Sequence, residues 1–297
     1  MKDIILARDK KELYYRYWPA QKEEKVLQLV HGANEHSGHY DEFARWMNKR
    51  GVSVYALDNR GHGLNPLVEG YIHINPEDWE KLPEDVILLG ELIKEKTNKI
   101  PYLLGHSMGS FIARIVALKG EEYKGFFFLG TGWEPQLKLQ SGLALAEGLI
   151  LLHGDHYQGP LMERLIYEVY RREIIKKGDA KSFFGWFTQD PDKLTEAEEK
   201  AALIEGFSLG AFKSLLHLVE AAQETENISK ITAPVHFLSG EKDPVGKSTR
   251  AVDQAYRAYK EAPFGAYRHI YPQMYHEILN DEAREEVYRD LLYLMQI

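Results

Sequence analysis

Cysteine is absent from the 297 residues of this chain. The protein therefore has no disulfide, no thiolate nucleophile and no cysteine metal site, which suits a reducing compartment. A net charge of −8 without a lysine or arginine cluster argues against nucleic acid as a partner. The N-terminus lacks the apolar core of a signal peptide, and no apolar run is long enough to span a bilayer. We therefore expect a cytoplasmic protein, for which peripheral contact with lipid stays open.

Short apolar runs that predict strands alternate with periodic segments that predict helices. The expected strands are residues 4–6, 13–17, 26–30, 52–57, 102–104, 125–130, 235–239 and 267–271. The expected helices are residues 40–50, 85–96, 111–118, 249–260 and 282–295. This alternation predicts an α/β fold with a doubly wound, mostly parallel sheet.

The alternation stops after Gly130. Residues 131–229 are mostly helical in pattern and rich in aromatic side chains, without a convincing central strand. We therefore expect a core formed by residues 1–130 and 230–297, and a helical cap formed by residues 131–229. Such a cap would lie over the carboxyl edge of the sheet, where open α/β sheets bind their ligands.

A Gly-x-Ser-x-Gly turn joins the strand at residues 102–104 to the helix at residues 111–118. This is the setting of a nucleophile elbow, a tight turn that requires small residues two positions before and after the serine. Gly105 and Gly109 occupy these positions around Ser107. A serine that only caps a helix is the simpler alternative, but the strand–turn–helix context favours Ser107 as a nucleophile.

A serine hydroxyl needs a base to take its proton and an acid to fix the tautomer of that base. On a hydrolase sheet the acid and then the histidine follow the serine, at the ends of later strands. Asp243 follows the strand at residues 235–239, with Glu241 as the alternative acid. His276 follows the last strand and precedes the last helix, whereas the pattern places His269 within that strand. We therefore predict Asp243 and His276 as the acid and the base.

Two backbone N–H groups must bind the oxyanion that forms during acyl transfer. Met108 directly follows the serine, and Ala33 lies in the loop after the strand at residues 26–30. We predict these two residues as the donors. The three histidines of that loop, His31, His36 and His39, fit no common zinc spacing, so we expect no metal.

The chain resembles the α/β-hydrolases of the monoacylglycerol lipase and lysophospholipase-like group, also labelled serine aminopeptidase S33. The matching stretches are His31-Gly32-Ala33, Glu35-His36-Ser37-Gly38 with Tyr40, Arg60-Gly61-His62-Gly63, Gly105-His106-Ser107-Met108-Gly109, Gly240 with Asp243, and Tyr275-His276-Glu277. The resemblance implies an α/β-hydrolase fold, a Ser107–Asp243–His276 triad and oxyanion donors at Ala33 and Met108. It departs at Asn34, Ser110 and Asn65, which stand where the group often has glycine, glycine and serine.

The expected activity is hydrolysis of a monoacylglycerol or lysophospholipid-type ester through an acyl-enzyme, without metal or organic cofactor. The expected partner is a small acyl ester or lipid, with transient membrane contact through the cap as an open possibility. An iminopeptidase and a hydrolase-fold receptor with little turnover are the alternatives. Six aromatic residues are candidates for an acyl pocket in the cap: Trp133, Tyr157, Phe183, Phe184, Trp186 and Phe187.

Overall fold

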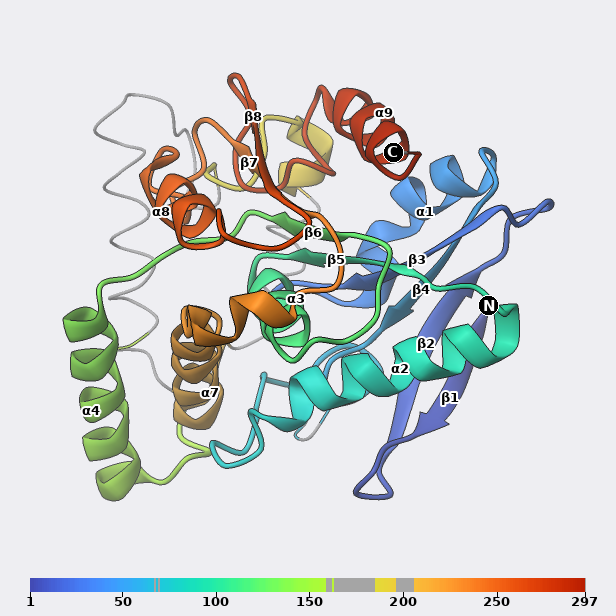
Figure 1. Cartoon of the computed structure of the whole chain (residues 1–297). Helices are drawn as coiled ribbons and strands as arrows, with labels where there is room; N and C mark the ends of the chain where they lie inside the picture. The colour runs from blue at the N-terminus through green and yellow to red at the C-terminus, as the bar shows by residue number, and fades with distance from the viewer. Residues whose placement is uncertain (67, 69, 159–161, 163–184, 196–205, 297) are drawn as a thin grey trace.

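A sheet of eight strands runs through the centre of the molecule, in the order β1-β2-β4-β3-β5-β6-β7-β8 (Figure 1). This computed structural model describes the whole chain except residues 67, 69, 159–161, 163–184, 196–205 and 297. The strands are β1 (Lys2–Leu6), β2 (Glu12–Trp18), β3 (Lys25–Val30), β4 (Val52–Leu57), β5 (Tyr102–His106), β6 (Phe126–Leu129), β7 (Val235–Gly240) and β8 (Ala266–Tyr271). The pairs β1–β2 and β2–β4 are antiparallel, and the other pairs of neighbours are parallel.

Helices cover both faces of this sheet. They are α1 (Asp41–Asn48), α2 (Lys81–Thr97), α3 (Met108–Leu118), α8 (Arg250–Ala258) and α9 (Arg284–Leu294). Figure 1 shows α1 and α9 on one side of the sheet and α2 and α3 on the other. The chain is thus a doubly wound, mostly parallel α/β protein with the α/β-hydrolase arrangement, as the sequence predicted.

Alternation of side chains along the strands divides the core into two layers. In β6, Phe126 and Phe128 pack in the cluster that contains α2, α3 and α8 residues. Phe127 and Leu129 pack in the cluster that contains α1 and α9 residues. All four side chains are fully buried. Burial on both faces explains why this strand is an unbroken apolar run.

Two predicted helix starts differ from the structure for local reasons. The first predicted helix begins as a 3-10 turn, η1 (Ser37–Tyr40), because the His36 side chain accepts a hydrogen bond from Gly38 N. The helix α2 begins earlier than predicted and contains Pro83 in its first turn. Proline is tolerated there because the first N–H groups of a helix have no intrahelical partner.

Between β6 and β7 the described residues form the helices α4 (Gln136–His153) and α7 (Leu209–Ala221) and the 3-10 turn η2 (Thr225–Lys230). The helices α4 and α7 pack against each other, and α7 also contacts α3. Isolated bridges join Phe207 to Ile72 and Ser208 to Gln158. Phe207 is thus anchored to the loop between β4 and α2. Within the described part of the chain, no helix combines the length and the apolar character needed to cross a membrane.

Candidate active site

Ser107 lies in the turn between β5 and α3, with φ 51° and ψ −119°. This conformation is strained for a residue with a side chain, and strain of this kind is typical of functional sites. A Cβ on Gly105 would come within 2.1 Å of the Gly109 carbonyl oxygen, and a Cβ on Gly109 within 2.1 Å of the Val30 oxygen. Both positions therefore require glycine, as the sequence predicted.

Asp243 and His276 form a buried pair at the ends of neighbouring strands. Asp243 follows β7 and His276 follows β8, and their side chains are 0% and 2% exposed. His276 Nδ1 lies 3.0 Å from Asp243 Oδ1. That oxygen also accepts the Val245 N–H at 2.8 Å, and Oδ2 accepts the Ser239 hydroxyl at 3.3 Å. A carboxylate so placed accepts the Nδ1–H of His276, which leaves Nε2 as the basic nitrogen.

The alternative residues from the sequence lie elsewhere. Glu241 is exposed, and its Oε2 accepts the backbone N–H of Gln273 at 3.1 Å. His269 Nε2 lies 3.3 Å from His236 Nδ1 across β7 and β8. Because each has another partner, the geometry favours Asp243 over Glu241 and His276 over His269.

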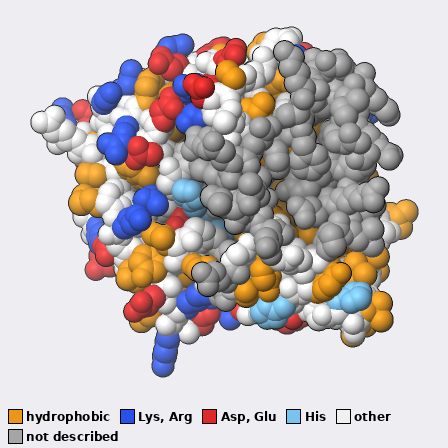
Figure 2. Space-filling view, turned by 180° about the vertical axis from the view of Figure 1, so that it is seen from behind, with side chains coloured by type: hydrophobic (Ala, Val, Ile, Leu, Met, Phe, Trp, Pro, Cys, Tyr) orange, Lys and Arg blue, Asp and Glu red, His pale blue; other side chains and the backbone are white. Residues whose placement is uncertain are grey.

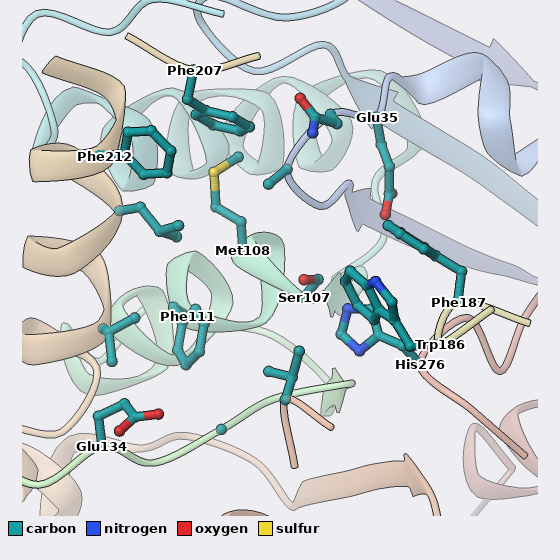
Figure 3. A pocket seen from close by; sticks show the side chains of 16 residues that line it. Glu35, Ser107, Met108, Phe111, Glu134, Trp186, Phe187, Phe207, Phe212 and His276 are labelled. Carbon is teal, nitrogen blue, oxygen red and sulfur yellow. The ribbon is translucent and has the colours of Figure 1, made fainter. Parts of the chain in front are cut away.

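One pocket contains the serine, the histidine and both predicted oxyanion donors. Ser107, His276, Ala33 and Met108 all contribute to its wall (Figure 3). The loop that carries Ala33 approaches the nucleophile closely, since a Cβ on Gly32 would lie 3.0 Å from Ser107 Cβ. The following residue, Asn34, has φ 59°, a left-handed conformation that asparagine adopts more readily than most residues. This explains why asparagine can replace glycine there.

Apolar side chains form most of the remaining wall. They are Phe111, Trp186, Phe187, Phe207, Phe212, Leu215, Val219 and Val245. Figure 3 shows Phe207 and Phe212 on one side of Met108, and Trp186 and Phe187 beside His276. Glu134 is a charged residue on this wall, and its Oε2 pairs with Lys138 at 3.0 Å and Lys247 at 2.9 Å. The pocket thus combines Ser107 and His276 with a mostly apolar wall that also contains the ion-paired Glu134.

Sequence reasoning located only part of this wall. Trp186 and Phe187 contribute to it, whereas Tyr157 is 45% exposed and Trp133 packs on the core cluster beside α3. Phe183 and Phe184 lie outside the described residues. Sequence reasoning missed Phe212, Leu215 and Val219. Their helical spacing in α7 was a usable signal, because these positions recur on one face of a helix.

The loop histidines considered for metal binding contact three different partners. His31 Nε2 accepts the Asn59 N–H at 2.9 Å, His36 accepts from Gly38 N, and His39 Nε2 lies 3.2 Å from Glu277 Oε2. They therefore do not converge on one ion. Glu35 and Glu277 approach each other near His39, and His106 Nδ1 lies near both carboxylates, 3.0 Å from Glu35 Oε1 and 3.8 Å from Glu277 Oε1.

A second cluster of ligand-type side chains, His73, Asp155 and His156, joins the loop between β4 and α2 to the segment that follows α4. The rings of the two histidines are stacked, with centroids 3.8 Å apart at 17°. His73 already contacts Ser208 Oγ at 2.9 Å and Asn75 Oδ1 at 3.1 Å. Since stacked rings direct their lone pairs in nearly parallel planes, we assign no metal to this cluster.

The sheet order and the strained serine after β5 define the protein as an α/β-hydrolase. The chain belongs to the Hydrolase_4 family, described as serine aminopeptidase, S33, whose model matches residues 21–283.

Two relatives and one solved structure support the same class of enzyme. The chain is 26% identical over 285 residues to the monoacylglycerol lipase of Mycolicibacterium smegmatis, covering 94% of this chain and 91% of that protein. It is 36% identical over 121 residues to the monoglyceride lipase of Mus musculus, covering 40% and 39%. A thermostable carboxyl esterase of Bacillus coagulans shares the fold, with a TM-score of 0.85, 22% identity and coverage of 100% and 97%. The chain is thus a serine ester hydrolase in the group that contains monoacylglycerol lipases.

Proposed function

We propose that this protein hydrolyses a monoacylglycerol or a lysophospholipid-type ester through a Ser107–His276–Asp243 triad. The observation that carries the proposal is the buried Asp243–His276 pair, which places His276 in the wall of the pocket that contains Ser107. The names of the relatives support the substrate class, and the apolar wall supports an acyl chain.

In this mechanism the Ser107 hydroxyl oxygen attacks the ester carbonyl carbon while His276 Nε2 takes the hydroxyl proton. The carbonyl oxygen becomes an oxyanion, which accepts hydrogen bonds from the N–H groups of Ala33 and Met108. Collapse of this intermediate breaks the bond to the alcohol, and His276 returns its proton to the departing oxygen. Water then attacks the acyl-enzyme by the same route and releases the fatty acid and Ser107.

The acyl chain occupies the apolar wall in this proposal. Each methylene that the chain buries there contributes roughly 0.8 kcal/mol. The rate constant kcat/KM should therefore rise with chain length until the apolar surface is filled. The salt-bridged Glu134 is a poor neighbour for an apolar chain, because withdrawing it from Lys247 and water is costly. We infer that the chain ends before this residue.

We further propose that residues 131–229 form a cap that selects the substrate and contacts lipid aggregates. Along α4, the side chains of Leu137, Leu151 and Leu152 are 81%, 81% and 76% exposed. Their spacing places them on one side of the helix. Exposed leucines of this kind favour a lipid surface over water.

The proposal is tested by the Ser107→Ala variant and a substrate panel. A fluorophosphonate should label the parent protein once, and the variant not at all. The exposed Ser141 on α4 offers a matched control, because Ser141→Ala should keep the label and the activity. The panel contains p-nitrophenyl esters, monoacylglycerols, lysophospholipids and aminoacyl amides. Faster turnover of amides than of esters would contradict the proposed substrate class, and a label that persists in Ser107→Ala would contradict the proposed nucleophile.

A further inference from the structure

His106, the residue before the candidate nucleophile, is buried between two acceptors. Its Nδ1 lies 3.0 Å from Glu35 Oε1, and its Nε2 lies 3.3 Å from the carbonyl oxygen of His276. A neutral imidazole carries one N–H, so only the protonated ring donates at both positions. The His106 side chain is 1% exposed, so solvent does not replace Glu35 or the His276 carbonyl as its hydrogen-bond partners.

The charges around His106 agree with this protonation state. Burial lowers the pKa of His106, but the negative charges of Glu277 and Glu35 outweigh it and raise this pKa to about 10. Burial raises the pKa of Glu35, but the positive charge of His106, the hydrogen bond from His106 and smaller contributions from His39 and Glu277 together outweigh burial and hold this pKa well below its usual range. Glu277 Oε1 lies 3.8 Å from His106 Nδ1. We call His106, Glu35 and Glu277 the His106 cluster.

Each member of the His106 cluster is tied to a different part of the candidate site. His106 directly precedes Ser107, and Glu277 directly follows His276. Glu35 Oε2 accepts the N–H of Gly32 at 2.9 Å, and Gly32 directly precedes Ala33. The three loops come from distant parts of the sequence. The cluster thus joins the oxyanion loop, the serine turn and the histidine loop beneath the reacting groups.

Neighbouring side chains also contact the carboxylates of the cluster. The Tyr40 hydroxyl donates to Glu35, and its oxygen lies 3.1 Å from His106 Nδ1. Glu277 Oε2 accepts from Asn280 at 3.0 Å and lies 3.2 Å from His39 Nε2. A buried network that is satisfied in this way holds its members in one arrangement.

We propose that His106 is a positioning residue of the reaction: ion-paired with Glu35 and Glu277, it fixes the loops of Ala33, Ser107 and His276 relative to one another. This inference rests on the proposed function, since it assigns a role to residues next to the proposed triad. Removal of the cation leaves two buried carboxylates without their shared partner and the His276 carbonyl without its donor. Such carboxylates repel each other, and the loops they hold move apart. Displacement by about 1 Å costs on the order of 100-fold in rate.

The first test is His106→Asn, which removes the charge and one of the two donors. Turnover of a short p-nitrophenyl ester is measured per active serine, with the serines counted by fluorophosphonate labelling. We expect kcat to fall by about 10- to 100-fold with KM nearly unchanged, because the loss concerns alignment and not binding. The control is His236→Asn on β7, a buried histidine whose partner is His269. It should lower the melting temperature while keeping kcat per active serine.

The second test uses Glu35→Gln, which keeps the shape of the side chain and removes one anion. The Glu35→Gln/His106→Asn double variant should lose less activity than the product of the single losses, because the two charges act as a pair. The pH profile gives a readout that packing alone does not change. His106 is faced by Glu35, Glu277, Tyr40 and His276. With one anion removed, the pKa of His106 falls, so kcat should decline at lower pH on the alkaline side than in the parent protein.

Two results would overturn the proposal. Full kcat per active serine in His106→Asn, with only a lower melting temperature, would reduce His106 to a packing role. If that variant does not fold, Glu35→Gln decides: an unchanged kcat together with an unshifted alkaline side of its pH profile would also overturn the proposal. Failure of the proposed function is distinguishable, since it would appear in the parent protein as absent ester turnover or as a label away from Ser107.

Discussion

Replacing Asp243 by asparagine tests whether its negative charge or its hydrogen-bond geometry matters more to His276. In a serine protease triad the same change costs about 10⁴-fold in kcat, because the amide selects the wrong histidine tautomer. Here Asp243 Oδ1 accepts from both His276 Nδ1 and the Val245 N–H. An amide NH₂ group at that position would face two N–H donors. The amide oxygen is therefore expected to stay there, and the reactive tautomer to persist.

The other end of the amide fits the same orientation. Its NH₂ group would replace Oδ2, 3.3 Å from Ser239 Oγ, and the Ser239 hydroxyl can donate to the Gly240 carbonyl oxygen at 3.2 Å instead. The loss is then the charge alone. Hydrogen bonds to charged groups contribute about 1.5–3 kcal/mol and neutral ones about 0.5–1.5 kcal/mol. A difference of roughly 1–2 kcal/mol corresponds to a decrease of about 5- to 30-fold in kcat.

The assay is steady-state hydrolysis of a p-nitrophenyl ester at neutral pH. Asp243→Ala removes the acceptor as well as the charge and should lose about 10⁴-fold in kcat. Glu241→Gln is the matched control and should stay within about twofold of the parent, because this exposed carboxylate accepts the Gln273 N–H, which an amide oxygen can accept as well. If Asp243→Asn is as inactive as Asp243→Ala, the orientation inferred from Val245 is wrong. If Glu241→Gln is the inactive variant, the acid is Glu241.

Two further predictions concern the cap. Phe212→Ser in α7 should flatten the rise of kcat/KM with acyl-chain length, since Phe212 lines the pocket. Hydrolysis of an acetate ester is the internal control and should stay unchanged. An unaltered chain-length profile would place acyl selection elsewhere. The double variant Leu151→Glu/Leu152→Glu, on the exposed side of α4, should reduce the fraction of protein that sediments with phosphatidylcholine vesicles. Hydrolysis of a dissolved acetate ester should stay unchanged. If the variant sediments as much as the parent protein, this part of α4 is not the lipid contact.

Much of the fold and of the candidate site could be predicted because local rules govern them. The turn at Ser107 excludes a Cβ at Gly105 and Gly109, so its glycines are visible in the sequence. Parallel strands end at one edge of the sheet, so residues that follow β7 and β8 meet there. This is why strand order pointed to Asp243 and His276 as candidates, although it left Glu241 open as the alternative acid.

The pocket wall and the charge on His106 could not be predicted in this way. A helical pattern shows that one side of α7 is apolar, but the packing of α7 on α3 decides that Phe212 lines the pocket that contains Ser107. Similarly, the sequence shows a histidine before Ser107 without showing which groups surround it. Its protonation depends on Glu35 and Glu277, which come from other loops. Such long-range contacts have no local signature.

Trp186 shows how closely the proposed cap and the candidate base are connected. From the sequence it is only a possible acyl contact. In the structure its ring centroid lies 5.4 Å from that of His276, and its carbonyl oxygen accepts the His276 N–H at 3.4 Å. The next carbonyl, of Phe187, accepts the Glu277 N–H at 2.7 Å. A polar substitution at Trp186 therefore removes apolar surface from the histidine as well as from the acyl chain. We expect Trp186→Gln to slow the hydrolysis of acetate esters and of long-chain esters alike. Phe212→Ser should slow the hydrolysis of long-chain esters alone, so this variant separates substrate selection from bond breaking.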